Sequence, residues 1–456
     1  MNSPNKVDIN VNAKNLVGEL KHSWRYIGYD ECNYTHTPEG EELIKKFGQL
    51  GDAPYYIRAH HMLCTGNCHG TYKWGSTNAY IEDEEGNPIY NWEVIDEILD
   101  VYLRNNCKPF FELGFMPMDL VDPRFVGDVN KWDRYGDYKR TGWAAPPKDY
   151  DKWKDLIYNL VKHCVEKYGE EEVLSWYWEL WNEPDIFYWK GTEDEFCKLY
   201  DYTEAAVHLA LEGARLGGPA TTGPMNGSNS SQFLDKFLKH CSSGKNYLSG
   251  EKGTRLDYIS FHVKGGGFPF ELNAAKETPS VKSLVAQVKE GLEIIKDNGY
   301  ADCEVVLSEA DPDGWAAGGM YDNPNMNFRN TEYYASYVAS AYQHIKDIAD
   351  AMEMDVRPLA WAFLFRGERC FEGTRTFSTQ GIDKPIFNLF KIYGQLANQE
   401  LELQSSQAEN VFDFLDRDGK EKEPEVSGIA VVKEEKTIQI FLYSHHDDWD
   451  LEKEFD

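Results

Sequence analysis

The sequence has no long hydrophobic run. No stretch of 18 consecutive apolar residues occurs in its 456 residues, and the first ten, MNSPNKVDIN, contain no apolar segment of the kind that directs secretion. A membrane-spanning helix needs about 20 apolar residues, so the sequence excludes one. We therefore expect a cytoplasmic protein by default. Removal of a signal peptide from the sequence as given would instead make it periplasmic or secreted.

Positive charge is also scarce. Lysine and arginine together number 47 against 77 aspartates and glutamates, which gives a formal net charge of −30. A field of that sign repels the phosphates of nucleic acids and the surfaces of anionic membranes, so we expect neither as a partner. An anionic substrate would need a local basic group to overcome the same repulsion.

The cysteines lack a metal-binding spacing. They are scattered and odd in number, and several lie inside apolar segments, which is typical of reduced thiols in a core. Cys64, Cys68 and His69 are close in sequence, but no second Cys/His pair follows at the distance that a zinc finger needs. We therefore expect no metal and no other cofactor.

Short apolar runs alternate with amphipathic stretches along most of the chain, a pattern typical of a parallel sheet with crossover helices. Eight runs qualify as strands, the number that closes a barrel. The length of 456 residues accommodates a barrel and a smaller module. We predict an α/β fold, a (β/α)8 TIM barrel. The expected strands are Arg25–Tyr29, Tyr55–His60, Pro109–Leu113, Trp176–Leu180, Arg215–Gly218, Tyr258–His262, Val305–Ser308 and Leu359–Leu364.

The helices expected between these strands repeat apolar residues at spacings of three and four. Such stripes occupy Ile95–Tyr102, Trp153–Cys164 and Tyr334–Ile345. Thr192 and Glu195 form a capping-box pattern, in which each side chain bonds the backbone N–H of the other residue. A helix should therefore begin there, after the fourth strand.

The pattern changes near residue 400. Residues 400–425 are polar and acidic and are expected to form a linker or an irregular crossing, whereas Gly428–Val432 and Thr437–Tyr443 are rich in β-forming residues. Two strands alone are marginally stable, so they need partners such as the N-terminal Val7–Val11 segment. We divide the chain into residues 1–20, which join a β-sandwich, a barrel at 21–400, and a partial β-sandwich module at 401–456, which we expect to be incomplete.

The most distinctive motif is Trp-Glu-Leu-Trp-Asn-Glu-Pro at residues 178–184, where the fourth expected strand ends. Barrel active sites are built at the carboxyl ends of the strands. If the strand stays regular, alternation places Glu179, Trp181 and Glu183 on one face. Pro184 has no N–H and ends the ladder. Glu183 is thus expected at the mouth of the barrel.

A second strand-end carboxylate is Glu309, which follows the seventh expected strand in Val-Val-Leu-Ser-Glu-Ala-Asp-Pro at residues 305–312. Strands four and seven are three positions apart around a barrel of eight, so Glu183 and Glu309 should face one another across its mouth. An isolated glutamate at a strand end is usually a surface or ion-paired residue. A pair, one of them in an Asn-Glu-Pro context, favours catalysis.

Two carboxyl groups in such positions are what glycoside hydrolysis requires. We predict that Glu183 is the general acid/base and Glu309 the nucleophile of a double displacement, about 5–5.5 Å apart. The surroundings must keep the acid protonated and the nucleophile ionised. A hypothesis from another class is a catalytically silent carbohydrate-binding barrel, against which the presence of both acids argues.

Over roughly residues 24–400 the chain resembles glycoside hydrolase family 39, whose acid/base motif is similar to Trp181–Asp185. The resemblance implies a retaining mechanism and substrates such as β-xylosides or α-L-iduronides. It implies sugar contacts for His60, on the second strand, and for His262, at the end of the sixth. Asn182 would form a hydrogen bond with the sugar 2-hydroxyl. Trp361, on the eighth strand, would either form the floor of the sugar site or fill the interior of the barrel.

Two departures from the family's xylosidase pattern bear on which sugar the protein is expected to accept. Many of its xylosidases read His-x-Tyr after strand six and Glu-Trp at the nucleophile, whereas this chain reads His-Val-Lys264-Gly and Glu309-Ala-Asp311-Pro. Both segments resemble the α-L-iduronidase branch, in which a lysine binds the uronate carboxylate. Lys264 is equally suited to pair with Asp311.

Resemblance to bacterial β-xylosidases covers more of the chain, including Trp-Gly-Ser-Thr-Asn-Ala-Tyr at residues 74–80. The first hypothesis is therefore an exo-acting enzyme that removes terminal β-D-xylosyl residues from xylo-oligosaccharides, as in xylan degradation. An α-L-iduronidase-like uronidase is the second, and an α-L-arabinosidase is a further alternative. The expected partner is an oligosaccharide or glycoside substrate, and assembly into a homo-oligomer is left open.

Overall fold

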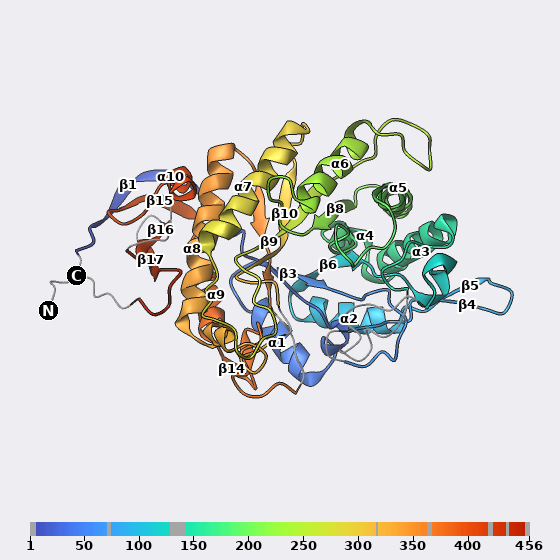
Figure 1. Ribbon diagram of the computed structural model, residues 1–456, viewed down its shortest axis with the longest axis horizontal. Helices are drawn as coiled ribbons and strands as arrows, with labels where there is room; N and C mark the ends of the chain where they lie inside the picture. The colour runs from blue at the N-terminus through green and yellow to red at the C-terminus, as the bar shows by residue number, and fades with distance from the viewer. Residues whose placement is uncertain are drawn as a thin grey trace.

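The computed structural model describes residues 6–70, 74–127, 142–315, 318–362, 367–417, 423–434 and 437–451. Its centre is a parallel sheet that curves into a barrel surrounded by helices, with a separate small sheet at one side, close to both termini (Figure 1). The barrel strands are β2 (Tyr26–Tyr29), β3 (Tyr55–Ala59), β6 (Cys107–Leu113), β7 (Tyr177–Leu180), β8 (Arg215–Thr221), β9 (Tyr258–Lys264), β10 (Glu304–Asp311), β11 (Val356–Pro358) and β12 (Ala360–Trp361).

The eighth barrel strand is split and closes the ring. β11 pairs with β10 and β12 pairs with β2, both in parallel, and only Leu359 separates the two short strands. Leu359 itself bonds across to β10, with its N–H donating to Leu307 O and its carbonyl accepting from Ala310. The eight predicted strands are therefore confirmed. The last begins earlier than expected, and residues 363 and 364 of the prediction lie outside the described part of the chain.

Aromatic side chains fill the inside of the barrel beneath its carboxyl end. Parallel barrels enclose layers of bulky side chains and no open pore. Here the layers are unusually aromatic, with Tyr26, Phe110, Tyr177, Tyr258 and Trp361 buried together with Val306 and Leu359. This rigid filling gives the functional groups at the strand ends a firm base.

Amphipathic helices cover the outside of the barrel. The stripe predicted at Trp153–Cys164 is the buried face of α3, and the stripes at Ile95–Tyr102 and Tyr334–Ile345 are those of α2 and α8. The helices are α1 (Pro38–Gly48), α2 (Glu93–Arg104), α3 (Tyr150–Tyr168), α4 (Glu170–Leu174), α5 (Glu193–Ala210), α6 (Asn229–Ser243), α7 (Val281–Asp297), α8 (Glu332–Met352), α9 (Pro385–Tyr393) and α10 (Val411–Asp416). Among the described helices, none is long and apolar enough to cross a membrane.

Smaller elements occupy the connections between the barrel strands and helices. Two short antiparallel pairs are present, β4 (Tyr80–Glu82) with β5 (Pro88–Tyr90) and β13 (Ser378–Thr379) with β14 (Ile382–Asp383). The described 3-10 helices are η1 (Cys32–Tyr34), η2 (Met118–Leu120), η3 (Pro123–Phe125) and the longer η5 (Pro324–Asn330). All nine cysteines lie in the described residues, and none forms a disulfide.

The small sheet is antiparallel, in the order β1-β15-β16-β17. Its strands are β1 (Ile9–Glu19), β15 (Gln399–Ser405), β16 (Glu425–Lys433) and β17 (Thr437–His445). The N-terminal segment thus belongs to this sheet, but its neighbour is β15. The expectation that residues 400–425 form an irregular linker is wrong at its start, because Gln399–Ser405 is an inner strand. This strand is polar, and backbone pairing on both of its sides holds it in place.

One side of the small sheet packs on α8 of the barrel. Glu425 on β16 accepts a hydrogen bond from Ser340 (2.7 Å) and lies 3.2 Å from His344 Nε2. Ser336 on the same helix lies 3.0 Å from Nδ1 of His445 on β17. These polar contacts, which lie one helical turn apart on α8, therefore fix the position of the small sheet relative to the barrel.

The capping box at the start of α5 offers a test of the helix analysis. Thr192 Oγ1 accepts from the Glu195 N–H (3.1 Å), and Glu195 accepts from the Thr192 N–H (2.7 Å). We predict that Thr192→Ala lowers the free energy of unfolding by about 1 kcal/mol, since a first-turn donor loses its acceptor. Chemical denaturation measures this, and Thr192→Ser should restore most of it. An equal loss for both variants would contradict a capping role.

Candidate active site

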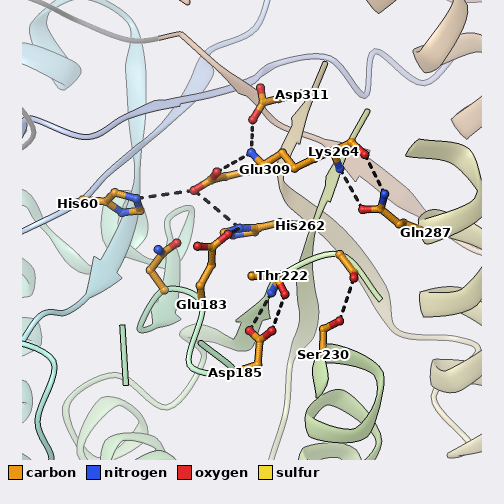
Figure 2. A network of polar contacts seen from close by, with 12 residues as sticks. His60, Glu183, Asp185, Thr222, Ser230, His262, Lys264, Gln287, Glu309 and Asp311 are labelled. Atoms are coloured by element: carbon orange, nitrogen blue, oxygen red, sulfur yellow. Dashed lines mark hydrogen bonds and ion pairs between the residues drawn. The ribbon is translucent and has the colours of Figure 1, made fainter. Parts of the chain in front are cut away.

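The two predicted carboxylates meet at the carboxyl end of the barrel. Glu183 follows β7, Glu309 lies near the end of β10, and His262 lies on β9 between them. His60 follows β3 and approaches Glu309 from the other side of the barrel mouth (Figure 2). Four strand ends that are distant in sequence thus converge on one point, as the barrel topology predicts.

Glu183 does not continue the regular alternation of β7. The strand ends at Leu180, and Trp181 and Glu183 adopt left-handed backbone conformations, with φ of 68° and 45°. Each such residue costs about 1–2 kcal/mol relative to the right-handed region. The Glu183 N–H donates to Ala220 O (2.8 Å), on the neighbouring strand β8. The motif is therefore bent away from the strand, and this bend places the Glu183 carboxyl.

Glu309 is placed by an irregularity in its own strand. The pairing of β10 with β9 is regular up to Leu307 opposite Phe261, but the next pair is Glu309 opposite His262. Ser308 is thus an extra residue on β10, and such bulges re-aim the side chains that follow them. Without the bulge, Ser308 would lie beside His262 in place of Glu309.

The two carboxyl groups and His262 form a tight cluster. A carboxyl oxygen of Glu183, a ring nitrogen of His262 and a carboxyl oxygen of Glu309 all lie within 4.8 Å of one another. His262 Nδ1 is 2.9 Å from Glu183 Oε1 and 3.8 Å from Glu309 Oε1. The fully buried imidazole therefore bridges the two acids, and both can reach the same atom of a small bound molecule.

Glu309 is surrounded by positive or hydrogen-bonding groups. Lys264 Nζ lies 2.6 Å from Oε2, and Arg58 Nη1 and His60 Nε2 lie 3.4 and 3.6 Å from Oε1. The Glu309 side chain is 9% exposed. Burial opposes its ionisation, but the charges of His262, Lys264, His60 and Arg58 hold the pKa of Glu309 well below its ordinary value. It is therefore a carboxylate at neutral pH.

The same three side chains are the one group of three or more His, Cys, Asp or Glu residues, within the described ranges, whose donor atoms lie close enough to hold a metal ion. The surroundings oppose that use. Lys264 and Arg58 already direct positive charge at Glu309, and a divalent cation there would be repelled by both. The charges of Lys264 and Arg58 therefore disfavour a metal ion at Glu309.

Lys264 belongs to a chain of alternating charges. Its ammonium contacts Asp311 as well as Glu309. Asp311 also forms an ion pair with Arg375 (2.6 Å) and accepts a hydrogen bond from the Trp361 N–H (2.9 Å). Asp311 and Arg375 are each 1% exposed. Burial lowers the pKa of Lys264, but Asp311 and Glu309 outweigh it and raise that pKa. Both oppositely charged neighbours keep Lys264 an ammonium.

Arg58 organises the opposite side of the site and was not singled out by the sequence analysis. Its guanidinium is fully buried, donates hydrogen bonds to Glu179 (2.5 Å) and Asn182 Oδ1 (3.0 Å), and forms an ion pair with Glu112 (3.0 Å). Arg58 Nη1 also approaches Glu309. An arginine inside an apolar strand is rare unless it is paired, which is the one signal by which the sequence could have revealed it.

His60 and Trp361 form the wall on the Arg58 side. His60 Nδ1 lies 2.6 Å from Glu112 Oε2, and its ring lies 4.7 Å from that of Trp361. Trp361 is 1% exposed and belongs to the aromatic filling of the barrel, with Arg58 5.5 Å above its ring. The indole therefore supports His60 and Arg58 from below, and a direct contact with substrate stays a prediction.

The comparisons with known proteins agree on one family. The model of glycosyl hydrolases family 39 matches residues 7–449. A β-xylosidase of Geobacillus stearothermophilus is 30% identical over 365 residues, which cover 76% of this chain and 63% of that enzyme. A β-xylosidase of Caldicellulosiruptor saccharolyticus is 25% identical over 444 residues, which cover 95% of this chain and 78% of that enzyme.

Among solved structures, a bacterial orthologue of human α-L-iduronidase superposes with a TM-score of 0.74 at 21% identity. The match covers 98% of this chain and 66% of that one, so the chain spans about two thirds of the length of several proteins that it resembles. At this identity the likeness shows the fold alone, a barrel joined to an antiparallel sheet.

The contact between Lys264 and Glu309 predicts a pH effect. Lys264 lowers the pKa of Glu309, so its removal should raise that pKa. We predict that Lys264→Met moves the acid limb of kcat/KM to higher pH with any substrate that is turned over, because the carboxylate form is then lost sooner as pH falls. Lys289→Met, which breaks an exposed pair with Glu293 on α7, is the control. An unmoved acid limb would show that Lys264 does not act on Glu309.

Proposed function

Because the chain belongs to glycosyl hydrolases family 39, we propose that it hydrolyses glycosides with retention of configuration, with Glu183 as general acid/base and Glu309 as nucleophile. Membership of the family makes it a glycoside hydrolase. Beyond this membership, we propose the mechanism and the sugar that is cleaved.

The separation of the two carboxyl groups is the observation that carries the mechanism. An oxygen of Glu183 lies within 4.8 Å of an oxygen of Glu309. Retaining enzymes hold their carboxyls about 5–5.5 Å apart, whereas inverting enzymes need about 6.5–9.5 Å to admit a water molecule between base and sugar. The distance here leaves room for a sugar carbon and favours direct attack by one carboxylate.

The environments support the assignment of roles. The Glu309 side chain is 9% exposed, and its carboxyl is kept ionised by the cations around it, as a nucleophile must be. Glu183 has no cation within ion-pair distance among the described residues apart from His262, and its side chain is 15% exposed. It therefore stands nearer to solvent, where a leaving group departs and water enters.

The reaction then takes two displacements. Glu309 attacks the anomeric carbon while Glu183 gives its proton to the glycosidic oxygen, so the C–O bond breaks and a glycosyl ester of Glu309 forms. The aglycone leaves as an alcohol. Glu183, now a carboxylate, removes a proton from water, whose oxygen attacks the same carbon and displaces Glu309. Two inversions give net retention.

Asn182 is suited to bind the sugar 2-hydroxyl. Its Oδ1 accepts from Arg58 Nη2 (3.0 Å), which fixes the amide and leaves the NH2 group as donor. Asn182 is 1% exposed and adjoins Glu183. A donor held in this way strengthens its bond to the 2-oxygen as charge develops in the transition state. His60 and His262 are proposed to contact the same sugar ring.

For the sugar itself, we favour exo-cleavage of terminal β-D-xylosyl residues. The two curated relatives reported above are named β-xylosidases. The charges at the site also support an uncharged sugar, because Lys264 already pairs with Glu309 and Asp311, and Arg375 pairs with Asp311. A substrate carboxylate would have to share cations that these acids already neutralise.

A uronidase is the second candidate, and the position of Lys264 supports it. The ammonium lies 2.6 Å from the proposed nucleophile, and one of its three donors is left over after the bonds to Glu309 and Asp311. A sugar carboxylate close to the anomeric centre could accept that bond. The similar solved structure named for α-L-iduronidase is in line with this alternative.

Substitution of the two acids tests the mechanism. We predict that Glu183→Ala slows substrates with poor leaving groups about 10²–10⁴-fold and activated aryl glycosides far less, because only the former need protonation. Glu309→Ala should abolish turnover, and added azide should yield a glycosyl azide of inverted configuration. Equal losses for both substrate types in Glu183→Ala, or a retained azide from Glu309→Ala, would refute the assigned roles.

A comparison of two aryl glycosides identifies the sugar that the protein accepts. We predict faster hydrolysis of aryl β-D-xyloside than of aryl α-L-iduronide, because the cations at the site are already paired. Since Lys264 also contacts Glu309, its substitution alone cannot separate the two sugars, and the informative quantity is the ratio of the two kcat/KM values. A Lys264→Met variant that lowers the iduronide value far more than the xyloside value would instead establish a uronidase.

A further inference from the structure

We propose that Asp185 is a positioning residue for Glu183: its buried carboxyl ties the segment that carries the proton donor to Thr222, beside the neighbouring barrel strand. The inference rests on the proposed function of Glu183. It concerns a residue that contacts neither the sugar nor the reacting atoms and acts through the placement of another.

The Glu183 segment needs external support. Strand β7 stops at Leu180, and the left-handed conformations of Trp181 and Glu183 are ones that residues other than glycine rarely adopt. Strained conformations of this kind persist only where the surroundings hold them. Pro184 follows and has no N–H with which to add a backbone bond. The residues on either side must therefore supply the restraints.

The first restraint comes from an irregularity in β8. The pairing of β8 with β9 skips Ala220, whose φ is 52°. Because Ala220 is left out of that pairing, its carbonyl is available on the other side, where it accepts from the Glu183 N–H (2.8 Å). This bond holds the backbone of the proton donor against the next strand.

The second restraint lies two residues further along both segments. Asp185 Oδ1 accepts from the Thr222 N–H (2.9 Å), and Oδ2 accepts from the Thr222 hydroxyl (Figure 2). The bond of Glu183 to Ala220 is thus followed by the bonds of Asp185 to Thr222, as two rungs of one short ladder. In the second rung a carboxyl side chain takes the place that a backbone carbonyl would have.

A third contact anchors the same residue to a helix. Asn229, the first residue of α6, donates its side-chain amide to Asp185 O. Asp185 is therefore held through its carboxyl and through its carbonyl, by β8 and by α6. With only 8% exposure, little solvent can replace these bonds if the carboxyl is removed.

The carboxyl of Glu183 has few restraints of its own. Within the described part of the chain, this carboxyl makes one hydrogen bond, with His262 Nδ1 at 2.9 Å. A shift of the backbone would therefore move the proton donor relative to His262 and Glu309. Misplacement by about 1 Å can cost two orders of magnitude in rate when it removes a catalytic group from its alignment. If Asp185 were purely structural, its substitution would instead lower the rates on all substrates together.

The leaving-group dependence of kcat/KM separates these cases. We expect Asp185→Ala to reduce hydrolysis of an alkyl or unactivated phenyl glycoside at least about 10-fold, and that of the 2,4-dinitrophenyl glycoside less than about 3-fold, since the latter needs no proton. Azide should accelerate turnover of the dinitrophenyl substrate by Asp185→Ala and give a retained glycosyl azide, because a misplaced Glu183 is a poor base for water.

The conservative variant Asp185→Asn should restore both rates. Asp185→Asn retains an oxygen for the Thr222 N–H and an amide for the Thr222 hydroxyl oxygen, so we expect both rates within about 3-fold of wild type. Thr222→Val removes one of the two donors and should show a smaller loss of the same selectivity. If Asp185→Ala does not fold, Thr222→Val carries the test.

Asp201 provides a matched control. It is a buried aspartate on α5 that accepts from a backbone N–H, that of Tyr247 (2.7 Å), and from a threonine hydroxyl, that of Thr254 (2.5 Å). Asp201→Ala is expected to lower the melting temperature without changing the ratio of the two rates. It therefore reports what general destabilisation does to the assay.

The outcomes are distinct. A selective loss in Asp185→Ala, or in Thr222→Val where Asp185→Ala does not fold, supports the proposal if Asp201→Ala shows none. Equal losses on both substrates, or none, overturn it. If Glu183→Ala itself shows no leaving-group contrast, the proposed function of Glu183 fails. If Glu183→Ala shows the contrast and the Asp185 and Thr222 variants do not, the positioning role alone fails.

Discussion

A buried carboxylate that must remain charged is the constraint on which the site depends. Moving a carboxylate out of water is costly unless nearby groups compensate for the lost hydration. For Glu309 the compensation comes from Lys264, Arg58, His60 and His262, which lie within 2.6–3.8 Å of its oxygens. Those groups are themselves charged or polar and buried, so each needs a further partner. The polar network at the barrel mouth follows from this requirement.

The partners extend the network in two directions. On one side Lys264 and Arg375 share Asp311, and on the other Arg58 and His60 share Glu112. Burial raises the pKa of Glu112 well above its ordinary value, although Arg58 opposes the shift, so this group can stay uncharged beneath the site. On the Lys264 side, charges of opposite sign alternate outward from Glu309 through Lys264 and Asp311 to Arg375, which helps to keep Glu309 ionised.

The barrel and both catalytic candidates were accessible to sequence analysis because their signals are local. All eight strands were predicted from short apolar runs, and Glu183 and Glu309 from carboxylates that end such runs. Arg58 and Arg375 were missed, because a charged residue in a loop or strand reveals its partner only when the chain is folded. The strand at Gln399–Ser405 was missed for a related reason, since its polar side chains conceal a backbone paired on both sides.

The sequence by itself determined the fold class, the strand ends at which the acids lie and the residue types available for two-carboxylate chemistry. Periodicity and short motifs record these features residue by residue. Only the tertiary structure decided where the carboxyls point. The bulge at Ser308 brings Glu309 beside His262, and the bend after Leu180 brings Glu183 to within 4.8 Å of both. Such irregularities arise from contacts between strands far apart in the chain, which no local pattern encodes.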